Sequence, residues 1–245
     1  MRTLYVDVSK KHVRMFFIVD EVVNGLKMVG MPEGAIVDTE LVNADFVHHQ
    51  IKTYTKKMLI KDMVIIAHIK PIVRFISYPQ AMTNKDIKNE LLHNMEDYLP
   101  IDLGDYTTGY TVVSKGDKIK VQLVTAKTRV LESYIKIAKY KKIRAIHANV
   151  LFVSNYIANR DKGNIVVGVT YGDTVLLQFL KDGASTMFAQ CDYTNMDRLF
   201  SSFTDVYGRL LLERAYFAEG IKEVLVDYLK SKGDITVISG ELYEL

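Results

Sequence analysis

The segment TLYVDVSKKHVRMFFIV, residues 3–19, decides the fold. It holds two apolar runs, 4–8 and 13–19, on either side of the polar stretch SKKH at residues 9–12. Runs of this composition around a short polar turn are typical of a β-hairpin. A third strand is predicted over residues 25–30, a helix capped by Asn43 over 44–57, and a buried strand over 63–68. The opening of the chain therefore predicts a β-β-β-α-β unit.

The same order of elements returns in the last third of the chain. Strands are predicted over residues 164–168, 174–180 and 185–189, and helices over 193–207 and 209–230. An apolar strand over 235–238 closes the series. A repeated β-β-β-α-β pattern predicts an α/β protein that is built from a duplicated unit.

A segment of different character separates the two copies. A strand over residues 73–78 stops at Pro79, and Thr83 caps a helix over 84–98. Strands over 107–113 and 118–125 form a predicted hairpin through residues 114–117. A helix over 129–141, a strand over 143–146 and a helix over 149–159 then return to the first copy.

Composition places the chain among folded proteins. It has 245 residues, of which 49% are hydrophobic and only 4 are proline, so disorder is excluded. A single cysteine, Cys191, excludes an intramolecular disulfide and fits a reducing compartment. No apolar run approaches the ~18–20 residues of a membrane-spanning helix. We therefore predict a globular protein of the cytoplasm.

The small net charge of +3 conceals a strong local asymmetry. Residues 115–144 carry ten basic and two acidic side chains, which gives +8 there and −5 in the rest of the chain. Such a stretch can attract acidic proteins, nucleic acid or anionic lipid headgroups. No motif of a nucleic-acid-binding fold accompanies it, so nucleic acid is not predicted as a partner.

No residue pattern supports an enzyme class. The glycine pairs Gly25/Gly30 and Gly163/Gly168 lack the Lys and Ser/Thr that a Walker A loop requires. The chain contains no G-x-G-x-x-G, H-E-x-x-H or G-x-S-x-G motif. We therefore predict neither catalytic residues nor a metal site.

Several short motifs in residues 1–160 share the pattern of one family. MPEGAIVD at 31–38 matches the loop LPxGAIVDG, and EDYLPIDL at 96–103 is similar to a helix end with YIPFPLDEV. RFISYP at 74–79, YTVV at 110–113, VQLVTAK at 121–127, VLESY at 130–134 and IHAN at 146–149 follow in the same order. Together they resemble the PilM family, the actin-like component of type IV pilus assembly. The last 83 residues, 163–245, resemble it only in outline.

The resemblance implies an actin-like, ribonuclease-H-like fold of two lobes. The first lobe would span residues 1–160 with an inserted α+β subdomain at 76–142, and a shortened second lobe would span 163–245. It implies a location in the cytoplasm at the inner face of the cell membrane. The implied partners are the N-terminal tail of a PilN-type membrane protein and the pilus assembly motor ATPase, and a homodimer is left open.

The family binds ATP between its lobes, and the corresponding turns of this chain have lost glycines. Its G-x-D-x-G-S-S turn aligns with residues 5–11, which keep Asp7 but place Ser9, Lys10 and Lys11 after it. Its D-x-G turn aligns with residues 168–170, where glycine replaces the aspartate, and its S-G-G turn aligns with Ser239-Gly240-Glu241. Glycines let backbone N–H groups approach phosphate closely. We therefore expect a degenerate nucleotide site without bound ATP. Its remaining candidate binding residues are Asp7, Ser9, Lys10, Lys11, Ser239 and Gly240, of which the two lysines keep the charge to hold an anion.

These observations favour an interaction scaffold that links inner-membrane assembly components to the cytoplasmic motor. Four tyrosines of the inserted segment are candidate partner contacts: Tyr78, Tyr98, Tyr106 and Tyr110. The alternatives are an actin-like ATP-binding protein or ATPase, and the cytoplasmic domain of a type II secretion L-type component. The chain ends five residues after Gly240, which favours a PilM–PilN-type fusion that is tethered beyond its C-terminus. A cell-division adaptor of the FtsA type would need a C-terminal amphipathic helix, which is not found in this sequence.

Overall fold

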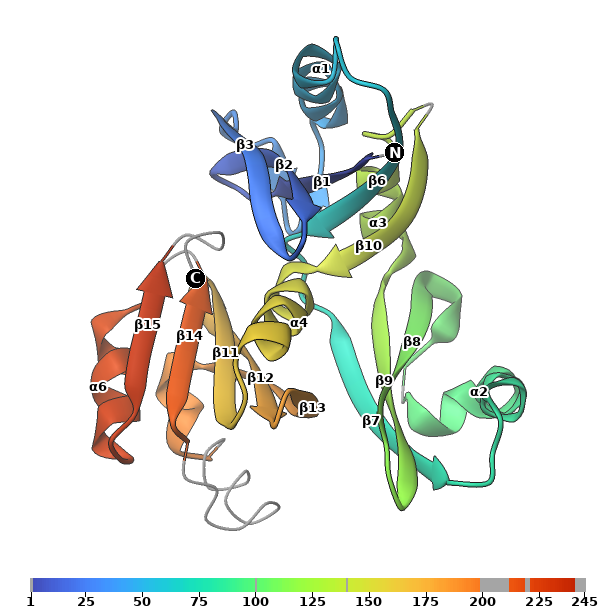
Figure 1. Ribbon diagram of the computed structural model, residues 1–245, viewed down its shortest axis with the longest axis vertical. Coiled ribbons are helices and arrows are strands. Elements are labelled where there is room, and N and C mark those ends of the chain that lie inside the picture. Colours follow the sequence, from blue (N-terminus) through green and yellow to red (C-terminus); the bar gives the residue numbers. More distant parts are fainter. Residues whose placement is uncertain (1, 100, 140, 199–211, 219–220, 241–245) are drawn as a thin grey trace. The chain divides into compact units, whose positions relative to one another are not determined.

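The computed structural model describes the chain except for residues 1, 100, 140, 199–211, 219–220 and 241–245 (Figure 1). It divides into two compact units. The first comprises Met1–Ile72, Leu99–Gly109 and Val124–Asn149, and the second comprises Val73–Tyr98, Tyr110–Leu123 and Val150–Leu245. Most of the predicted inserted segment therefore groups with the second unit, and the predicted lobe boundaries stay a prediction.

A five-stranded sheet forms the centre of the first unit. Its strands are β1 (Arg2–Val8), β2 (His12–Val19), β3 (Val22–Gly30), β6 (Ile60–Ala67) and β10 (Lys142–Ala148). They lie in the order β10-β6-β1-β2-β3, with β1, β6 and β10 parallel and β2 and β3 antiparallel to their neighbours. The apolar run MVIIA of β6 is buried, as expected for a central parallel strand that is covered on both faces.

Helices and a small hairpin complete the first unit. They are α1 (Ala44–Tyr54), β4 (Ile36–Val37), β5 (Glu40–Leu41), the 3₁₀ turn η1 (Leu103–Asp105) and α3 (Thr128–Ile135). The predicted cap of the first helix is confirmed, because the Asn43 side chain accepts a hydrogen bond from the N–H of Phe46 (3.1 Å). Helix α3 ends at Ile135, six residues before the predicted end at 141.

The sheet of the second unit has the same order. Its strands are β11 (Asn164–Tyr171), β12 (Thr174–Lys181), β13 (Ala184–Asp192), β14 (Arg214–Ala218) and β15 (Thr236–Gly240). They lie in the order β13-β12-β11-β14-β15, with β11, β14 and β15 parallel. The predicted repeat is thus confirmed, because both sheets place a three-strand meander beside two further parallel strands.

One part of that repeat is predicted wrongly. The expected helix over residues 209–230 contains the strand β14 and the shorter helix α6 (Glu223–Ser231). In the expected helix over 193–207, residues 193–195 form the 3₁₀ turn η2 (Tyr193–Asn195), and residues 199–207 lie outside the described residues. Ala215, Phe217 and Ala218 of β14 are all buried. Arg214 and Tyr216 are half-buried between them, but an alternation over five residues is too short to separate a strand from a helix by periodicity.

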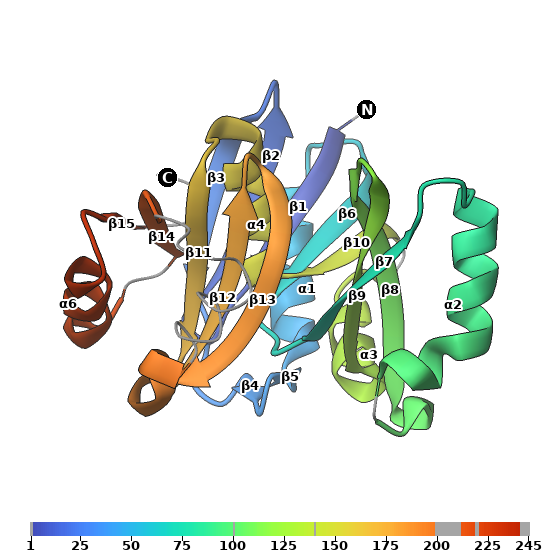
Figure 2. The same ribbon diagram turned by 90° about the horizontal axis from the view of Figure 1, so that it is seen from below.

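The chain between β6 and α3 forms β7 (Ile72–Pro79), α2 (Asn84–Tyr98), β8 (Tyr106–Lys115) and β9 (Lys118–Lys127), and α4 (Asn149–Arg160) follows β10. The predicted hairpin of β8 and β9 is confirmed, and the sheet order is β7-β9-β8. Helix α2 lies beside this sheet (Figure 2). It buries Ile87 and Leu91 against the β9 side chains Ile119, Val121 and Leu123.

Glu90 of α2 binds two tyrosines of this core. The hydroxyl of Tyr78 donates to Glu90 Oε2 (2.6 Å), and Tyr98 and Asn94 donate to Glu90 Oε1. Burial alone would raise the pKa of Glu90, but these three hydrogen bonds together outweigh it and lower the pKa. A carboxyl whose pKa is lowered on folding stabilises the fold above its ordinary pKa and loses that contribution as the pH falls.

We therefore expect Glu90→Gln to lower the free energy of unfolding at pH 7 by about 1 kcal/mol. The deficit should shrink as the pH falls below about 4, where the wild-type carboxyl is also protonated. Urea midpoints followed by circular dichroism from pH 3 to pH 7 measure it. Glu96→Gln, an exposed position on the same helix, is the control and should show no such pH dependence. A deficit that stays constant over this range would contradict the prediction.

Candidate functional site

A buried polar cluster lies where three parallel strands of the first unit end. Asp7 is near the carboxyl end of β1, His68 follows β6 directly, and Asn149 follows β10 directly. Their registers place these ends side by side, and all three side chains are buried. His68 Nε2 lies 2.9 Å from Asp7 Oδ1, and Asn149 Nδ2 lies 3.3 Å from His68 Nδ1. The carboxyl ends of parallel strands are the usual place for ligand-binding side chains in α/β proteins.

Arg14 completes the cluster from the neighbouring strand. It is the cross-strand partner of Asp7 in the β1–β2 register, and its Nη1 donates to Asp7 Oδ2 at 3.0 Å. Asp7 is 0% and Arg14 1% exposed. Because His68 contacts the other oxygen, both carboxylate oxygens of Asp7 are engaged by nitrogen donors. A buried pair of this kind is stable only while both partners are present.

A tyrosine hydroxyl near the cluster is held neutral. Tyr134 of α3 is fully buried, and burial, followed by the negative charge of Asp7, raises the pKa of Tyr134 far above its ordinary value. It therefore does not supply a charge for binding or catalysis at neutral pH.

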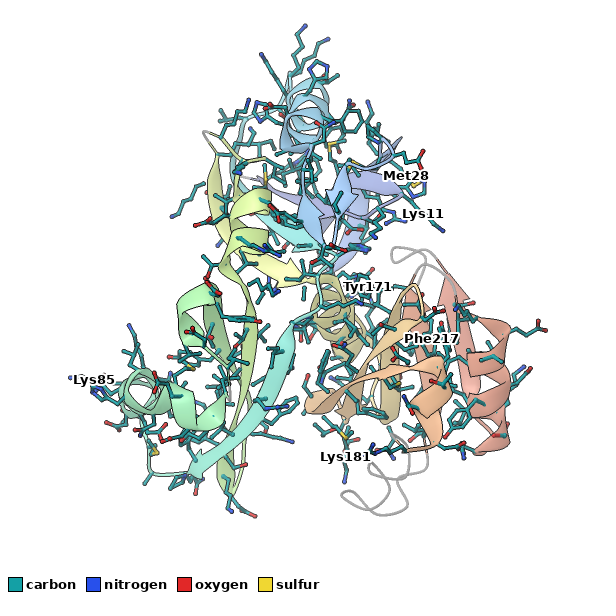
Figure 3. The ribbon with its side chains drawn as sticks, turned by 180° about the vertical axis from the view of Figure 1, so that it is seen from behind. Lys11, Met28, Lys85, Tyr171, Lys181 and Phe217 are labelled. Carbon is teal, nitrogen blue, oxygen red and sulfur yellow. The ribbon has the colours of Figure 1, made fainter. Side chains whose placement is uncertain are left out.

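The turn after β1 is closed by a side chain. Ser9 is 1% exposed, and its Oγ donates to the carbonyl of His12 and accepts from the His12 N–H, both at 3.0 Å. Lys10 and Lys11 are exposed, and Figure 3 shows Lys11 at this end of the hairpin. Of the candidate residues of the degenerate nucleotide site, Ser9 uses its hydroxyl within the turn, whereas anion binding by the two lysines stays a prediction.

In the second unit, two of the predicted turns meet on one rung of the sheet. Gly168 of β11 pairs with Phe217 of β14, and Phe217 pairs with Ser239 of β15. A Cβ added at Gly168 would lie 2.1 Å from Cε1 of the Phe217 ring. The ring, labelled in Figure 3, is 0% exposed. The position that the family's aspartate would occupy is thus covered by an aromatic side chain, while Ser239 is exposed and Gly240 half-buried.

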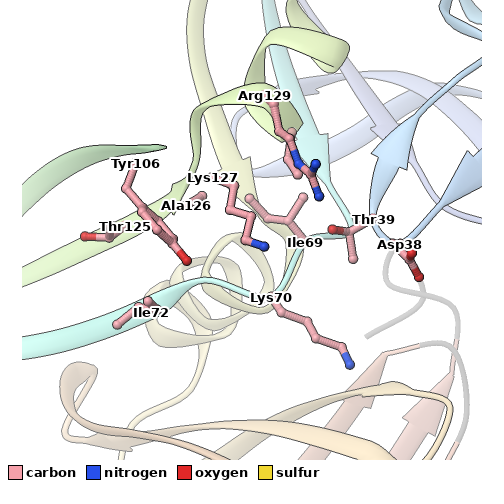
Figure 4. Close-up of a pocket in the computed structure, with 11 residues that line it drawn as sticks. Asp38, Thr39, Ile69, Lys70, Ile72, Tyr106, Thr125, Ala126, Lys127 and Arg129 are labelled. Atoms are coloured by element: carbon pink, nitrogen blue, oxygen red, sulfur yellow. The ribbon is translucent and has the colours of Figure 1, made fainter. Parts of the chain in front are cut away.

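A hollow of about 430 Å³ opens on the first unit (Figure 4). Apolar side chains from β6–β7, β9 and α3 line it, including Ile69, Ile72 and Val130. Three basic side chains also line it, Lys70, Lys127 and Arg129, together with one acid, Asp38. A second hollow of about 500 Å³ shares Tyr106, Lys127 and Arg129 with the first. The first hollow offers apolar contact and an excess of positive charge, whereas the second adds the acids Asp105 and Glu132.

The four predicted contact tyrosines lie in different surroundings. Tyr78 is 5% exposed and Tyr98 is half-buried, and both direct their hydroxyls to Glu90, so they serve the core of α2 and its sheet. Tyr110 on β8 is 39% exposed. Tyr106 is half-buried and lines both hollows. Exposure therefore leaves Tyr106 and Tyr110 as the better candidates for partner contact.

Two kinds of feature are absent from the described residues. No three His, Cys, Asp or Glu side chains among them are grouped so that they could hold a metal ion. Within the same residues, no helix combines the length and the apolar character that crossing a bilayer requires.

Sequence reasoning found Asp7 but missed Arg14, His68, Asn149 and Phe217. A signal for two of them is present in the chain, because His68 follows the apolar run MVIIA and Asn149 follows IHA. Polar residues directly after buried strands gather at one edge of a parallel sheet. Phe217 was missed for a different reason. The sequence predicts a helix over residues 209–230, so its place in the strand β14 is not foreseen.

The comparisons with known proteins agree on the fold. No family model and no curated protein matches the sequence. The chain is similar to a solved PilM–PilN type IV pilus biogenesis complex, with a TM-score of 0.73, 12% identity, and coverage of 100% of this chain and 89% of that one. It is also similar to the cytoplasmic domain of EpsL, an inner-membrane component of the type II secretion system of Vibrio cholerae (TM-score 0.56, 16% identity, coverage 91% and 84%).

A third solved structure is a Bacteroides thetaiotaomicron protein with an actin-like ATPase fold (TM-score 0.54, 8% identity, coverage 97% and 90%). The predicted α/β, actin-like fold is therefore confirmed. The resemblance to PilM that the motifs indicate is confirmed as a likeness of fold.

Proposed function

We propose that this chain is a non-catalytic scaffold of a type IV pilus assembly machine that has lost nucleotide binding. It would lie at the inner face of the cell membrane, bind the N-terminal tail of a PilN-type membrane protein and contact the assembly motor ATPase. The observation that carries the proposal is the engagement of both Asp7 oxygens by Arg14 and His68.

The residues of the first unit fit a magnesium nucleotide poorly. In the family pattern, the aspartate aligned with Asp7 lies in a phosphate-binding turn. A carboxylate that already neutralises a buried guanidinium cannot bind a cation or its waters unless Arg14 loses its partner. The turn itself offers an exposed pair of lysines and the inward-facing hydroxyl of Ser9 in place of flexible glycines.

The second unit supports the same conclusion independently. The family's second aspartate aligns with Gly168, and the ring of Phe217 fills the space beside it. An aspartate there would displace a fully buried aromatic ring and would itself be buried without a partner. Both units thus use the aligned positions for packing.

The hollow of Figure 4 supports a peptide partner. Its apolar floor suits the side chains of an extended segment, and Lys70, Lys127 and Arg129 suit an acidic group on that segment. The solved PilM–PilN structure is a type IV pilus biogenesis complex, and this chain shares the fold of that structure. A homodimer of the chain is compatible with this function.

The likeness to the cytoplasmic domain of EpsL supports a second candidate, a type II secretion component. Its lower TM-score of 0.56, against 0.73, makes it the weaker of the two. Titrating the corresponding secretion-system segment beside the PilN-type one distinguishes them.

The proposal is tested by calorimetric titration of the protein with two probes. The first is a synthetic peptide of the N-terminal residues of the PilN-type protein from the same organism, and the second is ATP with magnesium. We expect the peptide to bind. We expect ATP to give no binding heat at concentrations up to about 1 mM, a range in which weak ligands are still detected. Lys127→Ser/Arg129→Ser should weaken the peptide at least about tenfold, because truncating charges at an interface costs about 2 kcal/mol or more.

Lys85→Ser/Lys88→Ser is the matched control, since it removes the same charge from the exposed face of α2. It should leave the peptide affinity unchanged within about twofold. Binding of ATP with a micromolar dissociation constant would contradict the loss of nucleotide. Turnover of ATP would favour the actin-like ATPase instead.

A further inference from the structure

The opposite edge of the first sheet, where the parallel strands begin, carries a second charged surface. The registers pair Arg2 of β1 with Ile60 of β6, and Asp62 of β6 with Lys142 of β10, so these starts lie along one edge. Figure 1 shows the N-terminus next to the starts of β6 and β10. We name the exposed residues there the basic edge: Lys56, Lys57, Met58, Leu59, Lys142 and Arg144.

Positive charge dominates this surface. Strands β6 and β10 carry a single carboxylate, Asp62, which is half-buried. Lys141 is half-buried beside it, and its Nζ donates to the carbonyl of Ile60 (3.2 Å). The acidic residues Asp20 and Glu21 lie in the β2–β3 turn, on the other side of β1. The basic edge therefore faces solvent with four exposed cations, two on β10 and two in the loop before β6.

Two exposed apolar side chains, Met58 and Leu59, directly follow the two lysines of the loop. Leu59 is 80% exposed, the highest value among the large apolar side chains that the structure describes, and Met58 is 41% exposed. Their turn is held by the backbone, because Met58 N–H donates to the carbonyl of Thr55 (2.9 Å) and Ile60 N–H to that of Met58 (3.2 Å). Thr55 is buried and its hydroxyl donates to the carbonyl of Ile51 (2.8 Å). The turn thus presents Leu59 outward in a defined conformation.

We infer that the basic edge docks on the surface of an anionic lipid bilayer. Lysines next to a membrane gain attraction from anionic headgroups, and neighbouring apolar side chains gain by burial at the headgroup boundary. The combination of KKML in one turn with Lys142 and Arg144 beside it supplies both contributions. The phosphates of a nucleic acid would attract the cations but would leave Leu59 exposed to water. This contact involves neither the hollow nor its peptide. It deepens the proposed location at the inner face of the cell membrane and rests on that part of the proposed function.

Vesicle binding tests the inference without any partner protein. The whole chain is sedimented with vesicles of phosphatidylcholine alone and with vesicles that contain about 30% phosphatidylglycerol. The second composition gives the vesicle surface a negative potential. We expect binding to the anionic vesicles only, with a loss of at least about tenfold when NaCl is raised from 0.1 M to 0.5 M. Lys56→Ser/Lys57→Ser should lower the partition coefficient about 25-fold, since each lysine contributes about fivefold. Leu59→Ser should lower it about fivefold.

Matched variants on α2 separate a specific contact from general charge or hydrophobicity. Lys85→Ser/Lys88→Ser removes two exposed lysines, of which Figure 3 labels Lys85, and Leu92→Ser removes a leucine that is 66% exposed. Both should bind vesicles like the wild type, within about twofold. Equal losses in the α2 variants would overturn the inference. Equal binding to neutral vesicles, or full binding by Leu59→Ser together with tighter binding to a DNA duplex, would also overturn it.

Discussion

Replacing Asp7 by asparagine is expected to lower the free energy of unfolding of the first unit by about 3–5 kcal/mol, or to prevent its folding. The substitution preserves the shape of the side chain and removes its charge. Arg14, which is 1% exposed and donates to Asp7 Oδ2 at 3.0 Å, would then be a buried cation that has lost this carboxylate. His68, at 2.9 Å from Oδ1, would lose the same carboxylate.

A double substitution keeps this prediction testable if the single variant does not fold. Asp7→Ala/Arg14→Met removes both charges, and replacing a buried ion pair by apolar side chains is often close to neutral. We therefore expect the double variant to be more stable than Asp7→Asn by about 2 kcal/mol or more. Since Tyr134 is kept neutral by burial beside Asp7, it does not compensate for either loss.

The measurement must report on the first unit. The chain contains no tryptophan, so circular dichroism follows global unfolding in urea. Hydrogen exchange of peptides from β1, β2 and β6 then assigns the loss of stability to this sheet. If Asp7 is instead a free ligand for a magnesium nucleotide, Asp7→Asn would change stability by less than about 1 kcal/mol and would abolish ATP binding, which would contradict the scaffold proposal.

The second large effect is expected at Gly168. Gly168→Asp, which restores the residue of the family motif, should lower the free energy of unfolding of the second unit by about 3 kcal/mol or more. The new Cβ would lie 2.1 Å from Phe217 Cε1, and the ring is fully buried and cannot move into solvent. The carboxylate would also be buried beside an apolar ring, which cannot replace the hydration that it loses.

Two further variants separate the steric effect from the charge. Gly168→Ala introduces only the clash and should cost about 1–3 kcal/mol. Adding Phe217→Leu to Gly168→Ala should recover part of that loss, although Phe217→Leu alone should destabilise because it leaves a gap in the core. Hydrogen exchange in β11 and β14 locates the change. Gly168→Ala as stable as the wild type would contradict the close packing of this pair.

The sequence determined the local elements and their repetition. The hairpin after residue 3, the cap at Asn43 and the hairpin of β8 and β9 follow from patterns within about 15 residues, because turn chemistry and amphipathic periodicity act over that range. The actin-like fold followed from short motifs and the order of elements. The absence of the family's glycines from the aligned turns was also visible, since glycines are either present or absent in a sequence.

Only the tertiary structure decided what replaces the missing glycines. Asp7 and Arg14 are seven residues apart, but His68 and Asn149 reach Asp7 because β1, β6 and β10 are parallel neighbours, a pairing that no local pattern encodes. Phe217 meets Gly168 because β14, a strand of five residues that is too short to show clear periodicity, pairs beside β11. Local chemistry is written in consecutive residues, whereas the environment of a side chain depends on contacts between distant strands that form only in the folded chain.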